Sequence, residues 1–337
     1  MTEQMPTQPT PVGALRFNTD TALLEYFDGN RYVNITIDSP GQNTGGTRGL
    51  FAGGYTGPSV TNEIDYINVD TTGNALDFGN LGTARRGVAG TGSRSRGILA
   101  GGRVPGDLNT IEFITFASTG NASDFGDLTI TSHYGTGLSN GTRGIITAME
   151  NPSWTSNNSN RIDFITIAST GNALDFGDLY TGTRETSGCE SKTRGLIFGG
   201  TPAEINVIQY ITISTQGNSS DFGDTSTTNS RGSGGGNAVR GLFSLGNNPS
   251  VTTTVEYITI STLSNAIDFG DLTEARGNAD AASSPTRFTV GAGHGSSRVD
   301  TIDYTQIMTT GNFIFFGELV GTDRSQPGGL SNGHGGL

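Results

Sequence analysis

A repeat of about 47 residues occurs six times in this sequence of 337 residues. Each copy contains an Arg that opens an apolar run, and these are Arg48, Arg96, Arg143, Arg194, Arg240 and Arg287. The Phe of a Phe-Gly pair recurs in the same way, at Phe78, Phe125, Phe176, Phe222, Phe269 and Phe316. The steps along both series lie between 46 and 51 residues, so two independent landmarks keep one period. Such a period, with several short strands in each copy, predicts a propeller or a solenoid.

Each copy of the unit predicts four short strands. In the second copy these are strand a (87–93), strand b (96–102), strand c (110–117) and strand d (123–128). Strand b is apolar on both faces, which indicates a sheet packed between two others. Strand a is rich in Gly and Ser, which suits a crowded central axis where backbones approach closely. The pattern predicts an all-β fold, a six-bladed β-propeller over residues 47–337.

The two ends of the repeat array predict how the ring closes. The first copy begins at Thr47 with strand b and has no strand a before it. The segment after Thr322 aligns with residues 83–85 and with the strand a that follows them. We therefore predict that the C-terminal segment supplies the innermost strand of the first blade, which removes an exposed sheet edge.

The residues before the repeats predict a separate small element. Residues 1–12 are polar and Pro-rich and predict a flexible tail without the features of a secretion signal. Residues 13–38 predict a β-meander, since turn residues at 18–20 and 28–30 separate three short strand patterns. Residues 39–46 have the composition of a linker. A meander this small cannot bury a sufficient core alone, so it must pack on the propeller, on its own copies or on a partner.

Charge and composition exclude several classes of function. The formal net charge is −12 and Lys192 is the only lysine, so the chain has no basic surface for nucleic acid or anionic lipid. No run of 18 apolar residues predicts a membrane span. The single cysteine, Cys189, excludes an intrachain disulfide and a cysteine metal cluster.

The sequence offers no convincing catalytic or metal-binding motif. The Asp-Phe-Gly-Asp element recurs in nearly every copy and could suggest calcium, because calcium prefers oxygen ligands. A residue present in every blade more readily solves a structural problem that every blade shares. We also expect the opening Arg of a blade to pair with the acid on its strand c, except in the blade where Gln209 replaces that acid and the Arg must pair otherwise. The prediction is a protein without enzymatic activity, cofactor or metal, with the question of calcium left open.

Binding residues are expected in the irregular loops at one face of the propeller. Because strand direction alternates, the b–c and d–a loops emerge together, and only that face departs from the repeat. The candidate binding residues are Tyr55, His133, Tyr134, Trp154 and Tyr180. Aromatic rings with Asn and Ser neighbours suit sugar stacking and hydrogen bonding. The alternative for Trp154 is that it merely holds a long loop in place.

The order of landmarks within a copy resembles that of kelch repeats. A double Gly, a Tyr, an aromatic residue and an Arg-containing turn follow one another at Gly53-Gly54, Tyr66, Phe78 and Arg85. The resemblance spans residues 47–337 and implies a kelch-like propeller closed by its C-terminal strand. Phe replaces the usual kelch Trp in every copy, and the double Gly is lost at Ala148-Met149. The kelch architecture therefore carries over better than any kelch binding role.

Two stretches resemble proteins of tailed-phage particles. The repeat wording, such as T-R-G-L-F-A-G-G, looks like repeat proteins of marine phages, especially those that infect cyanobacteria. Residues 13–35 resemble a short module of phage fibres and other virion proteins. Its aromatic residues here are Phe17, Tyr26, Phe27 and Tyr32, and Tyr32 stands where the module usually has Trp. The alternative is an N-terminal arm of any β protein.

These resemblances imply a non-enzymatic virion structural protein, made in the host cytoplasm. The expected part is a tail- or fibre-associated appendage or a capsid decoration, present as a homo-oligomer or in several copies. The expected partners are other virion proteins and a host surface glycan, with no nucleic acid and no membrane insertion. The alternative is a cellular kelch-type module that binds proteins or glycans. A propeller hydrolase is disfavoured because the sequence has no convergent pair of acids.

Overall fold

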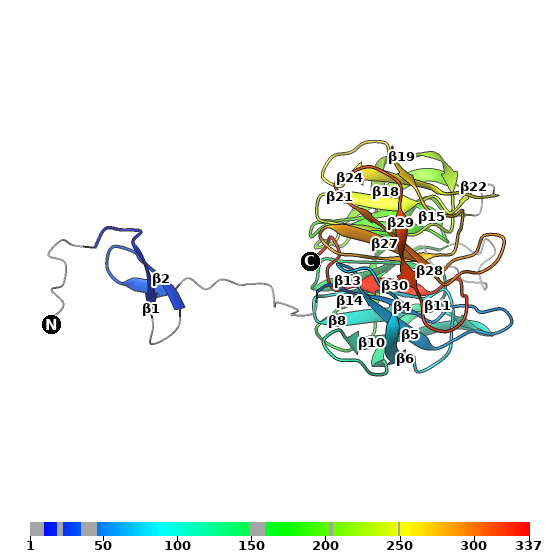
Figure 1. Cartoon of the computed structure of the whole chain (residues 1–337), viewed down its shortest axis with the longest axis horizontal. Helices are drawn as coiled ribbons and strands as arrows, with labels where there is room; N and C mark the ends of the chain where they lie inside the picture. The colour runs from blue at the N-terminus through cyan, green and yellow to red at the C-terminus, as the bar shows by residue number, and fades with distance from the viewer. Residues whose placement is uncertain (1–9, 19–22, 35–45, 148–158, 202–204, 249) are drawn as a thin grey trace. The chain divides into compact units, whose positions relative to one another are not determined.

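The computed structural model describes residues 10–18, 23–34, 46–147, 159–201, 205–248 and 250–337. The chain divides into two compact units, residues 1–44 and 45–337 (Figure 1). All regular structure in the described ranges is β-strand, so the all-β prediction is confirmed. No helix of these ranges is long and apolar enough to span a membrane.

The first unit contains a three-stranded antiparallel sheet in the order β1-β2-β3. Its strands are β1 (Leu15–Asn18), β2 (Leu23–Phe27) and β3 (Tyr32–Asn34). The register pairs Leu15 with Tyr26 and Phe17 with Leu24, which places these four side chains on one face because side chains alternate along a strand. All four are exposed. The first unit therefore presents an apolar face that its described residues, 10–18 and 23–34, leave uncovered.

The second unit consists of small antiparallel sheets, which we number 1 to 6 along the chain. Sheet 1 has the order β30 (Gly328–Ser331), β4 (Arg48–Ala52), β5 (Glu63–Asn68), β6 (Leu76–Asn80), and sheet 2 the order β7 (Ala89–Gly92), β8 (Arg96–Ala100), β10 (Gly106–Thr115), β11 (Ser123–Ser132). Sheet 3 is β12 (Thr136–Ser139), β13 (Arg143–Thr147), β14 (Ser159–Thr166), β15 (Leu174–Thr183), and sheet 4 is β16 (Ser187–Glu190), β17 (Arg194–Phe198), β18 (Ile205–Thr212), β19 (Ser220–Asn229). Sheet 5 is β20 (Gly234–Gly236), β21 (Arg240–Ser244), β24 (Thr254–Thr259), β25 (Ile267–Asp271), and sheet 6 is β26 (Asp280–Ser283), β27 (Arg287–Gly291), β28 (Thr301–Gln306), β29 (Ile314–Glu318). Three short strands complete the described set: β9 (Arg103–Val104) beside β10, and the pair β22 (Asn247–Asn248) and β23 (Ser250–Val251).

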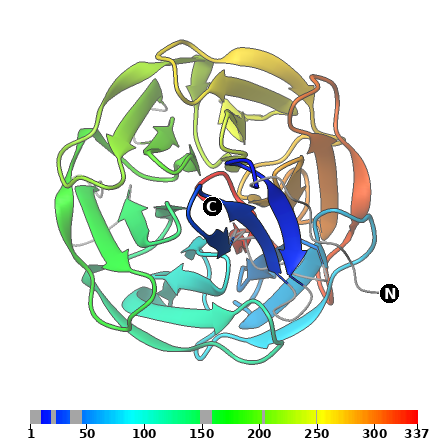
Figure 2. The ribbon, with the colours of Figure 1, turned by 90° about the vertical axis from the view of Figure 1, so that its left-hand side faces the viewer.

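The sheets follow one another around a central axis, an arrangement consistent with a β-propeller (Figure 2). The first strand of each sheet lies nearest the axis, and we call these six the inner strands. Each inner strand contacts the inner strands of the sheets before and after it, and β26 contacts β30 in the same way. Strand β30 pairs antiparallel with β4, with Leu330 opposite Leu50, as the alignment of the C-terminal segment predicts.

The Gly-rich composition of the inner strands follows from their close approach. A Cβ atom on Gly90 would lie 2.2 Å from the carbonyl oxygen of Gly329, and one on Gly137 would lie 2.3 Å from that of Gly90. Real Cβ atoms do not approach backbone oxygens so closely, so only Gly fits without a shift of the strands. The prediction of small residues at a crowded axis is confirmed.

The opening arginines form no ion pair with the acids in the described part of the chain, which corrects the sequence expectation. Each of them instead donates from Nη1 to a backbone carbonyl oxygen of the next sheet, as Arg48 does to Phe116 at 2.6 Å. The other five donate to Ile167, Ile213, Ile260, Ile307 and Val69. The guanidinium of Arg48 also lies 5.0 Å from the ring centroid of Tyr66 in its own sheet. These arginines therefore hold consecutive sheets together through the backbone.

One polar side chain of each third strand, an acid or Gln209, contacts the fourth strand of the preceding sheet or the turn that follows it. Three of them bind a buried Arg of that turn, in the pairs Arg324–Asp65 (2.7 Å), Arg85–Glu112 (2.9 Å) and Arg276–Asp303 (3.1 Å). In the remaining sheets Asp163 and Glu256 accept from Thr129 and Ser226, and Gln209 exchanges two hydrogen bonds with the backbone of Thr181. Each third strand thereby fixes its neighbour, with or without a charge pair.

The Asp-Phe-Gly-Asp element and the Ser-Thr-Gly-Asn turn form one joint between sheets. The Oδ1 atom of Asn121 accepts from the backbone N–H of Asn80 at 3.0 Å, and the N–H of Gly120 donates to Phe78 at 2.7 Å. The same Asn contact recurs with Asn172, Asn218, Asn265, Asn312 and Asn74. The register of β5 and β6 shifts beside Gly79, which marks a β-bulge at this joint. The most regular parts of the repeat thus have a structural role in every sheet.

Candidate functional site

The connections between strands lie at two ends of the second unit. One end, the turn end, carries the connections from inner to second strands and the Ser-Thr-Gly-Asn turns. The other, the variable end, carries the loops from second to third strands and the connections that lead into the inner strands. Bridges at the variable end join loops of both kinds: Tyr55 to Ser325, Arg86 to Arg103, Arg184 to Thr201 and Gly277 to His294. The residues that differ between repeats therefore meet at one end.

One position just before each inner strand forms a ring around the axis, which we call the mouth ring. Its members are Gly87, Tyr134, Glu185, Arg231, Asn278 and Gln326. All six have φ between 54° and 64°, in the left-handed region. The backbone N–H of a ring member donates at 2.7–2.9 Å to the carbonyl oxygen of the member before it: Tyr134 to Gly87, Gly87 to Gln326, Gln326 to Asn278, Asn278 to Arg231 and Arg231 to Glu185. The fold thus requires the same unusual backbone at the mouth of every sheet.

The left-handed backbone of the mouth ring destabilises the fold wherever the residue has a side chain. A left-handed conformation costs an L-residue with a Cβ roughly 1–2 kcal/mol, and Gly avoids that cost. Among the six mouth-ring positions, Gly stands only at position 87, where the left-handed backbone carries no steric cost. Tyr134, Glu185, Arg231 and Gln326 are types that rarely adopt this conformation. Strain retained at equivalent positions, with a different side chain each time, indicates that the side chains themselves are used.

The mouth ring carries one ion pair and several neutral polar groups. Arg231 Nε lies 2.9 Å from Glu185 Oε2, with Glu185 buried and Arg231 half-exposed. Gln326 Nε2 donates to Asn278 Oδ1 at 3.5 Å. The ring of Tyr134 lies 4.3 Å from that of His133, between centroids. The mouth therefore offers hydrogen-bond donors, acceptors and one aromatic ring in a confined space.

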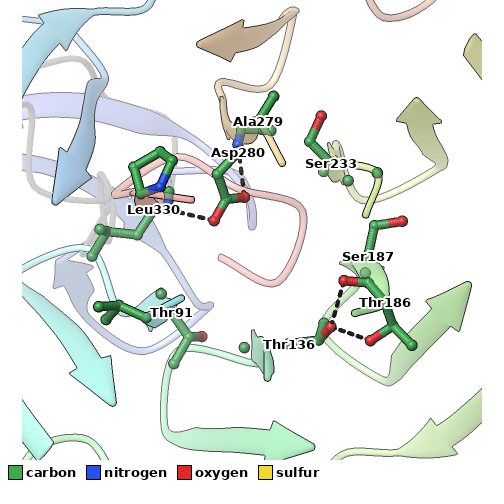
Figure 3. Close-up of a pocket in the computed structure, with 18 of the residues that line it drawn as sticks. Thr91, Thr136, Thr186, Ser187, Ser233, Ala279, Asp280 and Leu330 are labelled. Carbon is green, nitrogen blue, oxygen red and sulfur yellow. Dashed lines mark hydrogen bonds between the residues drawn. The ribbon is translucent and has the colours of Figure 1, made fainter. Parts of the chain in front are cut away.

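A cavity of about 110 Å³ continues from the mouth ring along the axis between the inner strands. Figure 3 shows Thr91, Thr136, Ser187, Ser233 and Asp280 around it. Its wall is made mainly of Gly, Ala and small hydroxyl residues. The crowding that selects small residues for packing thus also leaves a polar hollow at the centre.

Two acidic side chains line this cavity below the mouth ring, Asp280 and Glu190, and Glu190 Oε1 contacts His334 Nδ1. Asp280 lies at the start of β26. Its carboxylate accepts from the backbone N–H of Ala281 at 2.8 Å and from that of Gly329 at 2.7 Å. Burial raises the pKa of this carboxyl to about 7, although both N–H groups act to lower it. Asp280 joins β26 to β30 and leaves further acceptor capacity toward the cavity, since each carboxylate oxygen has two lone pairs.

Three of the binding residues expected from sequence lie at the variable end. Tyr134 belongs to the mouth ring and lines the cavity. His133 is buried, with Nδ1 3.1 Å from Asp107 Oδ1. Tyr55 is partly buried between the guanidinium groups of Arg86 and Arg298, at 4.7 and 4.5 Å from its ring centroid. Only Tyr134 of these three faces the central cavity.

The other two expected binding residues are placed differently. Tyr180 was expected in a loop, but it belongs to β15, because this fourth strand continues to Thr183. It is 71% exposed on the outer strand, away from the cavity wall. Trp154 lies outside the described residues, as does the rest of its insertion at 150–158.

The aromatic residues of the first unit lie on both faces of its sheet. Phe17 and Tyr26 belong to the exposed apolar face with Leu15 and Leu24. Phe27 and Tyr32 lie on the opposite face, with ring centroids 5.3 Å apart. On that face the guanidinium of Arg16 covers Tyr32, and it pairs with Glu25 at 2.7 Å. The two faces therefore differ. The side chains of the Tyr32 face contact one another, whereas the apolar side chains of the Phe17 face are exposed.

Sequence reasoning missed most of the mouth ring and Asp280. Glu185, Arg231, Asn278 and Gln326 occur in stretches that read as simple turns. The available signal was positional, because the residue before each Gly-rich strand differs in every copy while its flanks repeat. The six positions are recognised as equivalent only from their left-handed backbone. A Gly at one of the six, position 87, does not indicate that conformation at the other five.

The described residues hold no group of three or more His, Cys, Asp or Glu side chains placed to bind a metal ion. Cys189 is completely buried, and burial raises the pKa of its thiol well above the usual value. A buried thiol with a raised pKa is a poor nucleophile. Its position between sheets fits a packing role.

No family model matches the chain, and a search of curated proteins finds no match. The function has to be inferred from the residues and their geometry.

Proposed function

We propose that residues 47–337 form a six-bladed, kelch-like β-propeller that binds a target at its variable end. The neighbour contacts of the inner strands, from β30 through β26 and back to β30, support a closed ring. The observation that carries the binding role is the mouth ring. Five side chains there occupy left-handed positions for which the fold itself would favour Gly.

We further propose that the protein is a non-enzymatic structural component of a tailed-phage particle. The resemblance of residues 13–35 and of the repeats to phage proteins supports this assignment. A tail- or fibre-associated appendage or a capsid decoration would use the propeller to contact a host surface or a neighbouring virion protein. The charged groups of the cavity also favour binding over catalysis, because each acid already has a partner. Glu185 is paired with Arg231, Glu190 contacts His334, and Asp280 is held by two backbone N–H groups.

The first unit is proposed to attach the protein to the particle. Its four exposed apolar side chains lie on one face of a three-stranded sheet. A small sheet gains stability when such a face is covered, and an uncovered apolar face marks an interaction site. Incorporation into a particle, in several copies, would cover this face with protein.

A protein that starts at residue 46 is expected to fold as the second unit does and to be absent from particles. The reason is that residues 1–44 and 45–337 are separate compact units, so removal of the first leaves the sheets intact. Melting temperature and circular dichroism measure the fold, and mass spectrometry of purified particles measures incorporation. The full-length protein carrying Phe17→Ser, which changes only the apolar face, is the matched comparison.

Particles that incorporate both altered proteins at normal levels would contradict the attachment role. Absence of the full-length protein from purified particles would contradict the virion assignment. It would favour the alternative, a cellular kelch-type module that binds proteins or glycans.

A further inference from the structure

The wall of the central cavity excludes an apolar ligand. Leu330 and Val88 are the largest aliphatic side chains along it, and most other positions carry Gly, Ala, Ser or Thr. Sites for apolar ligands are lined mainly by large aliphatic and aromatic side chains. A ligand of this cavity must instead satisfy hydroxyl groups, amides and backbone groups.

Two hydroxyl groups of the wall have no partner among the described residues. Thr91 Oγ1 and Ser187 Oγ are both without a hydrogen bond, and each residue is only 5% exposed. Both residues line the cavity (Figure 3). A buried hydroxyl that lacks a partner is unfavourable, and most such groups in proteins are satisfied. Because a hydroxyl both donates and accepts, a ligand with hydroxyl groups complements them.

The charges at the mouth leave little net charge for a ligand. Glu185 and Arg231 neutralise each other at 2.9 Å. Asp280 and Glu190 remain, the latter in contact with His334 Nδ1, and their carboxylates disfavour an anion in the cavity. Arg231, Asn278 and Gln326 supply N–H donors, and Asp280 and Asn278 supply oxygen acceptors. Mixed donors and acceptors with no excess positive charge fit a neutral ligand.

We propose that this cavity binds the terminal unit of a neutral carbohydrate. Tyr134 offers the rim an aromatic face for the sugar ring, while Arg231, Asn278, Gln326 and Asp280 bind its hydroxyl groups. Thr91 and Ser187 meet the part of the sugar that enters deepest. This inference rests on the proposed binding role of the variable end and specifies the chemistry of its target.

The size of the cavity fits one end of a glycan. At roughly 10–15 Å³ for each water-sized group, about 110 Å³ accommodates on the order of ten non-hydrogen atoms. This number of atoms corresponds to a single sugar unit, so a longer oligosaccharide does not fit inside the cavity. The rest of a glycan would lie across the variable end.

Saturation-transfer NMR of the full-length protein tests the assignment directly. The probes are methyl α-glucopyranoside, methyl α-galactopyranoside and N-acetylglucosamine, with lysine as a cationic probe of similar size. We expect transfer to at least one sugar and none to lysine. The Thr91→Val protein removes one buried hydroxyl at constant shape, and we expect its sugar affinity to fall about tenfold while its melting temperature is unchanged or higher. The control is Thr170→Ala, an exposed position of the turn end, which should bind as the wild type does.

Each other outcome counts against the proposal in a distinct way. Sugar binding that Thr91→Val leaves unchanged would place the sugar elsewhere and overturn the cavity assignment. Transfer to lysine in preference to the sugars would show a site for cationic groups. If no probe binds while the protein still adheres to host cells, the carbohydrate assignment falls and the binding role of the variable end stands. If adhesion is absent as well, both fall.

Discussion

A chain that lacks residues 326–337 will lose its cooperative melting transition and aggregate. Strand β30 covers the edge of β4 and contacts β7 and β26, so its loss exposes a sheet edge and breaks the line of inner strands. Leu330 also packs in a core cluster with Leu50, Leu99 and Ile114, and loss of one buried Leu side chain alone costs about 2–5 kcal/mol. Calorimetry and size-exclusion chromatography measure the result.

The shorter deletion of residues 335–337 separates the strand from the end of the chain. It keeps β30 and removes only residues that follow it. The deletion also removes the buried Gly335 and Gly336, so we expect some loss of melting temperature. We expect this protein to remain monomeric and to keep a cooperative transition, because β30 still covers β4. A protein without residues 326–337 that melts as the full chain does would refute the role of β30 in closing the ring.

Arg324→Ala is expected to destabilise the second unit by about 3–5 kcal/mol at neutral pH, the cost of leaving one buried charge without its partner. Arg324 is fully buried, and its Nη2 atom lies 2.7 Å from Asp65 Oδ2 and donates to the carbonyl oxygen of Phe51 at 3.2 Å. After the substitution Asp65 keeps the backbone N–H of Val320 as a donor, at 3.0 Å. Chemical denaturation of both proteins measures the difference.

The loss is expected to depend on pH in a defined direction. Burial raises the pKa of Asp65 to about 6, and Arg324 opposes that rise. Without Arg324 the pKa rises further, so the folded variant holds a proton that the unfolded chain releases above about pH 4. The variant therefore loses stability as pH increases, and its deficit should be larger at pH 8 than at pH 5. Adding Asp65→Asn to Arg324→Ala should recover part of the loss at pH 8. Equal deficits at both pH values, with no recovery, would show that the ion pair contributes little.

The strand order and the edge strand from the C-terminal segment were predictable because they follow from the repeat itself. Two landmark series fix the period, and alternating apolar residues fix the strands within it. The missing strand before Thr47 and the surplus strand after Thr322 then have only each other as partners. The crowded axis was equally accessible, since a strand made entirely of Gly, as at 234–236, is favoured only where backbones approach closely.

The partners of repeated charges were not predictable from the same pattern. Five of the six copies have an acid on the third strand after the opening Arg, and the copy of Arg194 has Gln209 there instead. The sequence does not tell which copy is in reach, and the fold uses the turn arginines Arg85, Arg276 and Arg324 for the acids instead. The length of the fourth strand was also hidden, because the residues after Leu179 favour neither loop nor strand, and Tyr180 was misplaced for that reason.

The mouth ring was beyond sequence reasoning for a different reason. Its defining property is a backbone conformation that Gly usually signals, and here five of six positions carry other residues. Local propensity and structure disagree at those positions, which is the expected sign of residues kept for function. The candidate site is thus defined by φ angles and by hydrogen bonds between sheets, and neither can be read from a single amino-acid sequence.

The measurement that tests the binding role most directly compares the wild type with Glu185→Gly/Arg231→Gly/Gln326→Gly. The triple variant removes both partners of the ion pair together and relieves three left-handed positions. Each Gly is expected to leave stability unchanged or to add up to about 1 kcal/mol, since relief of strain exceeds the entropy cost of Gly. Adhesion of the labelled full-length proteins to host cells is measured beside their melting curves. We predict a melting temperature at or above that of the wild type and at least a tenfold loss of adhesion. Undiminished adhesion by a stably folded triple variant would contradict the account.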